Sequence, residues 1–307
     1  MKELWTEKYR PQTLDGYVFT DPVQREQIEY FVQEKSIPHL LFTGPAGTGK
    51  TTLAKILVNC LDIDSYDFLQ VNASRDNGVD FLKSKIEGFV STLPFGDLKI
   101  VLLDEADYLS HNAQAILRGL METYQAQARF ILTANLAHKI ISPLKSRCQQ
   151  IVIDKTDKTE FTTRAATVLL NEGIDFEIDT LDSYVRVTYP DLRNCLKQLQ
   201  TNSVSGSLTI AKSTSDGSSV DYKLEVVELF KAGKIREARI LFCTNTPADE
   251  CESVFTWLHN NLDLWSNTVE GQDEAIKIIR KGAATHSLVA DHEINLSATF
   301  VELSQIS

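Results

Sequence analysis

The first half of the chain alternates short apolar runs with longer amphipathic segments. The apolar runs have the length of strands and lie at residues 36–43, 68–71, 100–103, 130–133 and 151–153. Between them, apolar residues recur at helical spacing over residues 50–61, 79–92 and 111–124. Strands that alternate with helices predict a mostly parallel sheet with helices on both of its faces. We therefore expect an α/β domain over residues 1–154.

The second half shows helical spacing and no further series of strands. Residues 157–172 and 191–201 predict a small α-helical domain over residues 155–205. The stretch that follows is rich in Ser, Gly and Thr, and it predicts a linker over residues 206–222. Helical spacing then returns, which predicts a third, helical domain over residues 223–307.

Composition narrows the class of protein. Of 307 residues, 43% are hydrophobic and 24% are charged, which is typical of a globular protein. No run of about 18 apolar residues is present, and the N-terminus has no apolar signal-peptide core. The five cysteines lie far apart without a C-x-x-C pair, which favours a reducing compartment over a zinc site or a disulfide framework. We expect a cytoplasmic protein without membrane contact.

The net charge of −11 disfavours a chain whose whole surface binds nucleic acid. Any contact with DNA would have to come from a local basic patch or from backbone amides.

The first apolar run leads into a glycine-rich loop that matches the pattern G-x-x-x-x-G-K-[ST]. The loop comprises Gly44, Pro45, Ala46, Gly47, Thr48, Gly49, Lys50 and Thr51, and Thr52 follows it. The glycines let backbone N–H groups turn toward phosphate oxygens, and the next helix begins with a favourable dipole for an anion. Lys50 would reach the β- and γ-phosphates of ATP, and the Thr51 hydroxyl would ligate Mg²⁺. The alternative, a chance match in a turn, is disfavoured by the strand–loop–helix context.

Two carboxylates follow the third apolar run. Asp104 and Glu105 stand at the end of a predicted buried strand, so both would lie at the carboxyl edge of the sheet beside the phosphate loop. Asp104 would hold Mg²⁺, and Glu105 would polarise the attacking water as a general base. An acidic helix cap is the alternative for this pair alone. Together with the phosphate loop, the carboxylates predict an ATPase site.

Two further polar residues extend this site. Asn135 ends the next apolar strand, where its amide could orient a water or a γ-phosphate oxygen; an ordinary turn asparagine is the alternative. Arg147 lies just before the last strand, and neither its charge nor its position suggests a partner in the chain's own site.

Eight motifs in order resemble the clamp-loader group of AAA+ ATPases. They are EKYRP at 7–11, GPAGTGKTT at 44–52, NASRDNGVD at 72–80, DEAD at 104–107, AILRGLMETY at 115–124, TAN at 133–135, SRC at 146–148 and PDLR at 190–193. Archaeal and eukaryotic replication factor C small subunits share most of them. The short chain and the divergent C-terminal third look closer to the large ATPase subunit of the T-even phage clamp loader, which favours a bacteriophage origin. Bacterial loader subunits usually carry a four-cysteine zinc module, which the cysteine pattern here excludes.

The resemblance implies an AAA+ P-loop domain, a small helical lid and a C-terminal helical collar. It makes Arg147 an arginine finger that enters the neighbouring subunit's site in trans, with a surface arginine as the alternative. It makes Arg193 a lid residue that senses the γ-phosphate, with an ordinary helix arginine as the alternative. It also assigns the adenine pocket to Tyr9, Arg10, Pro11 and Val18.

The resemblance also implies contacts with partners. The equivalent of Gln114 relays DNA binding to the catalytic glutamate, and the equivalent of Arg118 couples neighbouring subunits. Without the resemblance, both would be solvated residues of a helix face. DNA phosphates would be contacted by Arg75, Lys83 and Lys85, which would otherwise form a solvated face. An exposed turn at residues 94–96 would dock on the clamp, with core packing as the alternative.

These features together predict an ATPase subunit of a sliding-clamp loader. ATP binding would assemble a spiral that opens the clamp and binds primer-template DNA, and hydrolysis would release the clamp closed on the DNA. The partners would be the clamp, the DNA, and copies of the chain with a distinct small subunit in a five-membered ring. The alternatives are another DNA-associated AAA+ ATPase, such as a branch-migration or recombination motor, and a nucleotide-binding scaffold without turnover. The SRC motif disfavours the first, and the complete set of catalytic residues disfavours the second.

Overall fold

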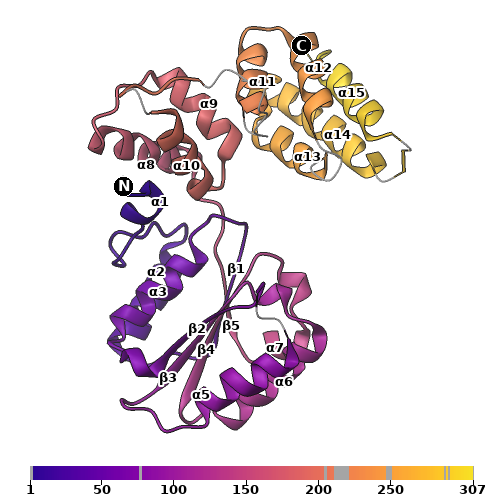
Figure 1. Cartoon of the computed structure of the whole chain (residues 1–307). Helices are drawn as coiled ribbons and strands as arrows, with labels where there is room; N and C mark the ends of the chain where they lie inside the picture. Colours follow the sequence, from indigo (N-terminus) through magenta and orange to yellow (C-terminus); the bar gives the residue numbers. More distant parts are fainter. Residues whose placement is uncertain are drawn as a thin grey trace. The chain divides into compact units, whose positions relative to one another are not determined.

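The computed structural model describes residues 3–75, 78–203, 206–210, 221–246, 251–286, 288–289 and 291–306. The chain divides into two compact units (Figure 1). One contains Met1–Glu160 with Pro190–Arg193, and the other contains Phe161–Tyr189 with Asn194–Ser307. Among the described residues, no helix combines the length and the apolar character that crossing a bilayer requires.

The first unit is built on a parallel sheet of five strands in the order β2-β3-β4-β1-β5. The strands are β1 (Leu40–Thr43), β2 (Phe68–Asn72), β3 (Lys99–Asp104), β4 (Ala128–Ala134) and β5 (Gln149–Val152). The register aligns Leu103 of β3 with Leu132 of β4 and Leu41 of β1 with Leu132. The carboxyl ends of the three central strands therefore lie together at one edge of the sheet.

Helices cover both faces of this sheet (Figure 1). One face packs on α2 (Pro22–Gln33) and α3 (Lys50–Cys60), and the other packs on η2 (Leu82–Glu87) and α6 (His111–Thr123). The central strands are buried on both faces, which explains their continuous apolar runs. The remaining short elements of this unit are α1 (Trp5–Lys8), η1 (Ser65–Asp67), α4 (Val79–Phe81), α5 (Gly88–Val90), η3 (Ala106–Tyr108), η4 (Ala137–Lys139) and α7 (Ser142–Lys145).

The predicted α/β fold is confirmed, and two local features differ from the expectation. The predicted strand at 36–43 begins only at Leu40, after a proline at position 38 that has no N–H to donate. The predicted helix at 79–92 is three segments, and the central one, η2, is a π-helix. Such an insertion widens the helix locally and often accompanies a functional surface.

In the part of the second unit that the structure describes, the regular elements are helices, together with one isolated bridge between Asp175 and Ser207. Its helices are α8 (Lys158–Asn171), α9 (Ile178–Thr188), α10 (Leu192–Asn202), α11 (Asp221–Lys231), α12 (Ile235–Asn245), α13 (Cys251–Asn260), η6 (Leu262–Leu264), α14 (Val269–His286) and α15 (His292–Leu303), of which α8 and α10 extend slightly into the other unit. The core of the C-terminal helices is rich in aromatic rings. Phe230 of α11 packs edge-on against Trp265 at 4.9 Å and stacks on Phe300 of α15 at 5.9 Å.

Part of the predicted linker is attached to the helices. Leu208 is buried and donates its N–H to the Asp175 carbonyl, and the Tyr184 hydroxyl donates to the Thr209 carbonyl at 2.7 Å. Residues 211–220 of the predicted linker lie outside the described residues.

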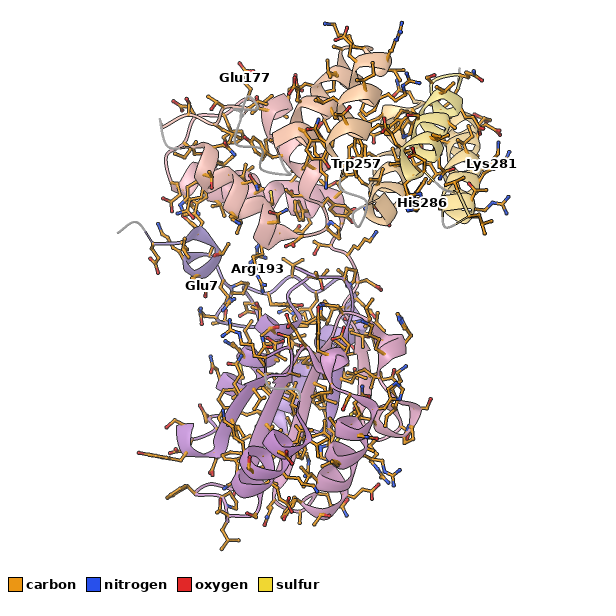
Figure 2. All side chains as sticks on the ribbon, turned by 45° about the vertical axis from the view of Figure 1, so that its right-hand side comes forward. Glu7, Glu177, Arg193, Trp257, Lys281 and His286 are labelled. Carbon is orange, nitrogen blue, oxygen red and sulfur yellow. The ribbon has the colours of Figure 1, made fainter. Side chains whose placement is uncertain are left out.

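Arg186 of α9 joins the lid helices to the C-terminal helices. Its guanidinium contacts Asp182 and Asp263, each at 2.6 Å, and is only 13% exposed. Its backbone carbonyl accepts hydrogen bonds from the Trp257 indole at 2.9 Å and from Asn261 at 3.3 Å. Trp257, labelled in Figure 2, comes from α13. The second unit therefore combines both predicted helical regions.

We expect Arg186→Ala to lower the free energy of unfolding by about 1.5–3 kcal/mol, because hydrogen bonds to a charged, largely buried group are lost. Denaturant titration of the full chain measures this loss. Arg25→Ala is the matched control, because Arg25 forms an exposed pair with Glu29 on α2. An exposed pair of this kind contributes little to stability. Equal losses in the two variants would contradict the role of Arg186.

Candidate functional site

The glycine-rich loop connects β1 to α3 and depends on residues without a side chain. Gly44 has φ +149°, and a Cβ there would lie 2.0 Å from the Ile153 carbonyl oxygen. Gly49 caps α3 in the left-handed conformation, with φ +95°. Any other residue would clash at the first position and be strained at the second. The loop is closed by the Thr48 hydroxyl, which donates to the Pro45 carbonyl at 2.9 Å.

Lys50 is folded into this loop. Its ammonium donates to the carbonyls of Gly44 at 3.0 Å and Pro45 at 2.6 Å, and its side chain is buried. Burial lowers the pKa of Lys50 to about 8, although Asp104 and Asp107 act in the opposite direction. A phosphate group would favour the charged form, because its negative charge would compensate for the hydration that the ammonium loses on burial.

Asp104, at the end of β3, is hydrogen-bonded to residues of α3 and β4. Its Oδ1 accepts hydrogen bonds from the Thr51 hydroxyl at 2.7 Å and from the Thr133 hydroxyl of β4. Thr51 belongs to α3 and Asp104 to the end of β3, so the loop and the central strands are tied at one oxygen atom.

Glu105 follows Asp104 in an uncommon backbone conformation. Its φ of 59° and ψ of 43° are left-handed, which costs about 1–3 kcal/mol in a residue with a side chain. Its N–H donates to the Thr133 hydroxyl oxygen at 3.0 Å. The Thr133 hydroxyl therefore contacts both residues. It donates a hydrogen bond to the Asp104 carboxylate and accepts one from the Glu105 backbone N–H. It lies in the quoted TAN motif, but a buried threonine inside an apolar strand carries no sequence signal for this role.

A cavity at the carboxyl edge of the sheet gathers most of the predicted nucleotide residues. Its lining comprises Ala46, Gly47, Gly49, Lys50, Thr51, Thr52, Asp104, Glu105, Thr133, Asn135 and Arg193. Arg193, labelled in Figure 2, belongs to the same compact unit as the sheet.

This donor set fits a triphosphate with a divalent cation. Helix α3 begins with Lys50 at the cavity, so its first backbone N–H groups and the lysine offer positive charge to an anion. The adjacent hydroxyl of Thr51 and carboxylate of Asp104 are hard oxygen ligands of the kind that Mg²⁺ prefers.

The predicted adenine residues are not among the lining of this cavity. Arg10 and Pro11 line a second cavity, which shares Thr52 with the first, and Arg10 pairs with Glu7 at 3.0 Å. Val18 is half-buried. Its neighbour Tyr17 is buried and contacts the loop, with its hydroxyl 3.5 Å from the Thr48 carbonyl oxygen. The adenine pocket therefore stays a prediction. Because Tyr17 contacts the glycine-rich loop, we add it to the residues predicted to line that pocket.

Gln114 is fully buried, unlike a solvated helix-face residue. Its amide nitrogen donates to the carbonyls of Leu109 and Lys139, each at 3.0 Å, and its oxygen accepts from the Ile141 N–H at 2.8 Å. It therefore joins the segment after the two carboxylates to the segment that leads into α7 and Arg147.

Arg118 and Arg147 come together outside the cavity lining. Both contact Oε1 of Glu122, a residue of α6 for which no role was predicted from the sequence. Arg118 lies on the same helix, four residues earlier, at 2.9 Å.

The predicted DNA residues lie at the surface of the first unit. Arg75, Lys83 and Lys85 are all exposed, and the two lysines belong to the π-helix η2. Residues 76–77 of the same motif lie outside the described residues.

An exposed apolar turn lies between α5 and β3. Leu93 and Phe95 are each 81% exposed, and Phe95 packs against exposed Tyr66 at 5.5 Å. Buried Asp67 accepts the N–H groups of Phe95 at 3.0 Å and Gly96 at 2.7 Å. The core-packing alternative for Phe95 is therefore wrong.

Comparison with known proteins agrees with this geometry. Residues 40–156 match the model of the ATPase family associated with various cellular activities. The replication factor C small subunit of Aeropyrum pernix is 39% identical over 241 residues, which cover 77% of this chain and 71% of that protein. The small subunit of Archaeoglobus fulgidus is 37% identical over 246 residues, covering 78% and 77%. The chain belongs to the replication factor C small-subunit family.

This membership makes the chain a clamp-loader ATPase with a P-loop that binds a nucleotide and a divalent metal. The share of each chain that aligns differs between relatives. The small subunit of Sulfurisphaera tokodaii is 40% identical over 211 residues, which cover 67% of this chain and 64% of that protein.

A solved structure, the RuvB Holliday junction branch migration motor of Thermotoga maritima, superposes with a TM-score of 0.54. It is 17% identical and covers 72% of this chain and 73% of that one. At this identity the likeness concerns the fold alone, and it confirms the AAA+ architecture.

We expect Thr133→Val to lower kcat for ATP about ten- to hundredfold, as loss of a residue that orients a metal ligand commonly does. The change keeps the shape of the side chain but leaves the Glu105 N–H without its acceptor and Asp104 without one donor. Steady-state ATP turnover measures the effect. Thr188→Val, a buried threonine of α9 whose hydroxyl donates to the Tyr184 carbonyl, is the matched control. A similar kcat loss in both variants would contradict the assignment.

We expect nucleotide binding to take up a proton above about pH 8. The free protein loses the Lys50 proton as pH rises through about 8. A bound triphosphate holds Lys50 charged, so affinity should fall with rising pH in this range. Calorimetry in buffers of different ionisation enthalpy counts the protons. Lys50→Met should abolish the uptake, and unchanged uptake in that variant would assign it to another group.

Proposed function

We propose that the chain hydrolyses ATP with Mg²⁺ at the cavity between the glycine-rich loop and the carboxyl ends of β3 and β4, and that hydrolysis releases a sliding clamp closed around primed DNA. The observation that carries this proposal is the Thr51–Asp104–Thr133 contact, because it brings the phosphate loop and the metal-binding carboxylate within hydrogen-bond distance. Magnesium, when bound, neutralises charge on the phosphates and polarises them for attack.

Within this site each side chain has a separate task. Lys50 binds the β- and γ-phosphates, and Thr51 and Asp104 hold the cation. Glu105, which lines the cavity directly after β3, accepts a proton from the attacking water. Asn135 orients the water or a γ-phosphate oxygen, and Arg193 contacts the γ-phosphate. Tyr9, Arg10, Pro11 and Val18 surround the adenine.

Arg147 completes the site of a neighbouring subunit. It follows α7, and among the described residues it is not part of the lining of this chain's own cavity. An arginine supplied in trans stabilises transition-state charge and contributes about 10³–10⁵ to kcat in related enzymes. A lone subunit is therefore a poor ATPase, and assembly supplies the missing group.

Assembly is proposed to give a five-membered ring of several copies with a distinct small subunit. We assign residues 1–154 to the AAA+ domain, residues 155–205 to the lid and residues 223–307 to the collar that holds the ring. The predicted linker over residues 206–222 is shortened at its end, because Asp221 and Tyr222 belong to α11 of the collar. The archaeal relatives support the loader function. A bacteriophage origin stays a prediction from the short chain and the divergent C-terminal third.

DNA binding is proposed to act on the site through Gln114. Arg75, Lys83 and Lys85 contact phosphates without reading sequence, which suits a protein that acts at any primer junction. Gln114 is hydrogen-bonded to the segments on both sides of it, so a shift of α6 would move the loop after Glu105. Arg118, one turn further along α6, couples neighbouring subunits.

The clamp is proposed to dock on the apolar turn of Leu93 and Phe95. The two backbone hydrogen bonds to buried Asp67 support this role, because a rigid turn loses little conformational entropy on binding.

The test is ATP turnover by the chain co-purified with its other loader subunits, alone, with clamp, and with clamp and primed DNA. We expect strong stimulation only when both are present. Arg147→Ala should lower the stimulated turnover about 10³-fold or more, since an arginine finger typically contributes that much. Phe95→Ala should lose the response to clamp while basal turnover stays unchanged. Stimulation by plain or branched duplex DNA, indifferent to the clamp, would replace this proposal with a branch-migration or recombination motor.

A further inference from the structure

Two guanidinium groups share one carboxylate oxygen on the surface of the first unit. Oε1 of Glu122 accepts from Arg118 Nε at 2.9 Å and contacts Arg147 NH2. All three side chains are partly exposed, Glu122 at 35%, Arg147 at 41% and Arg118 at 43%. The cluster therefore joins α6 to the segment after α7 at a surface that a neighbouring molecule can reach.

The carboxylate keeps two like charges together. Arg118 and Arg147 would repel each other without Glu122, since both bond to the same oxygen atom. A free arginine side chain also samples many rotamers, and holding it in one of them costs conformational entropy. Glu122 offsets both costs, because it leaves the cluster with a single net positive charge and restricts both side chains.

The guanidinium of Arg147 remains able to bind a second anion. The group has five N–H donors in a planar fork, and its contact with Glu122 uses one of the two terminal nitrogens. The other edge of the fork can meet a phosphate while the first edge stays on the carboxylate. Glu122 and a phosphate are therefore compatible partners of Arg147, and release of the ion pair is not required.

We infer that Glu122 is a positioning residue that holds the arginine finger Arg147, together with Arg118, in the orientation that reaches a neighbouring subunit's phosphates. This inference rests on the proposed function, in which Arg147 acts in trans. Among the described residues, Glu122 is not part of the lining of the nucleotide cavity.

The experiment measures ATP turnover of the assembled loader with clamp and primed DNA for Glu122→Gln, Arg147→Ala and the double variant. Glu122→Gln should lower kcat about ten- to hundredfold with little change in KM, since a misplacement of about 1 Å in a catalytic group can cost 10²-fold. The double variant should be no slower than Arg147→Ala, because positioning an absent finger has no effect.

A matched control separates positioning from loss of a surface ion pair. Glu29→Gln removes a carboxylate of similar exposure, 38%, that pairs with an arginine four residues before it on α2. We expect its kcat to equal that of the unchanged chain. Both Gln variants should show equal Tm and equal nucleotide affinity as isolated chains. Glu122→Asp, which keeps the charge, should recover part of the lost kcat even if Glu122→Gln folds poorly.

The outcomes distinguish failure of the positioning role of Glu122 from failure of the proposed trans role of Arg147. Loss of turnover in Arg147→Ala with none in Glu122→Gln overturns the positioning role and leaves the proposed function intact. A faster Glu122→Gln overturns it as well, because the carboxylate would then be withholding the finger. A double variant slower than Arg147→Ala shows a separate structural effect and overturns it. Unchanged turnover in Arg147→Ala overturns the trans finger itself, and with it the role of Glu122.

Discussion

The nucleotide site depends on the hydrogen bonds that converge on Oδ1 of Asp104. Thr51 approaches this oxygen from the start of α3, and Thr133 approaches it from β4. The parallel register of β3 and β4 makes this possible, because it aligns the carboxyl ends of neighbouring strands. Residues 53 positions before and 29 positions after Asp104 in the sequence therefore both donate hydrogen bonds to this one atom. These bonds position the phosphate loop beside Asp104 and Glu105, the residues proposed as metal ligand and general base.

The residues around Asp104 include positive φ angles and a buried lysine, both of which are uncommon in folded proteins. Gly44 and Gly49 adopt positive φ values, and Glu105 does so with a full side chain. The ammonium of Lys50 is buried, and the hydrogen bonds described for it go to backbone carbonyls rather than to a carboxylate. Its burial lowers the pKa to about 8. The left-handed backbone of Glu105 and the burial of Lys50 each raise the energy of the nucleotide-free protein, whereas the two glycines adopt positive φ without strain. A bound polyanion would compensate for the buried lysine, so part of the site's order is directed at its ligand rather than at folding.

Helix α6 lies between the site and the surface of the first unit. Its inward face carries Gln114, which is hydrogen-bonded to the segments before and after it, and its outward face carries Arg118 and Glu122. A single short helix therefore contacts the loop after Glu105 and the arginine proposed to serve the next subunit. In the second unit, Arg186 ties α9 to α13 and η6 through buried polar contacts, so lid and C-terminal helices form one compact body.

The sequence by itself determined the fold class and the core of the nucleotide site. Alternating apolar runs, G-x-x-x-x-G-K-[ST] and the paired carboxylates are local patterns, and their physical meaning does not depend on distant residues. Only the tertiary structure decided the burial of Gln114, the bridging role of Thr133, the exposure of Phe95 and the pairing of Arg147 with Glu122. These properties arise from contacts between segments far apart in the chain. A polar residue in an apolar strand or on an amphipathic helix looks the same in sequence whether its partner is water or another buried group.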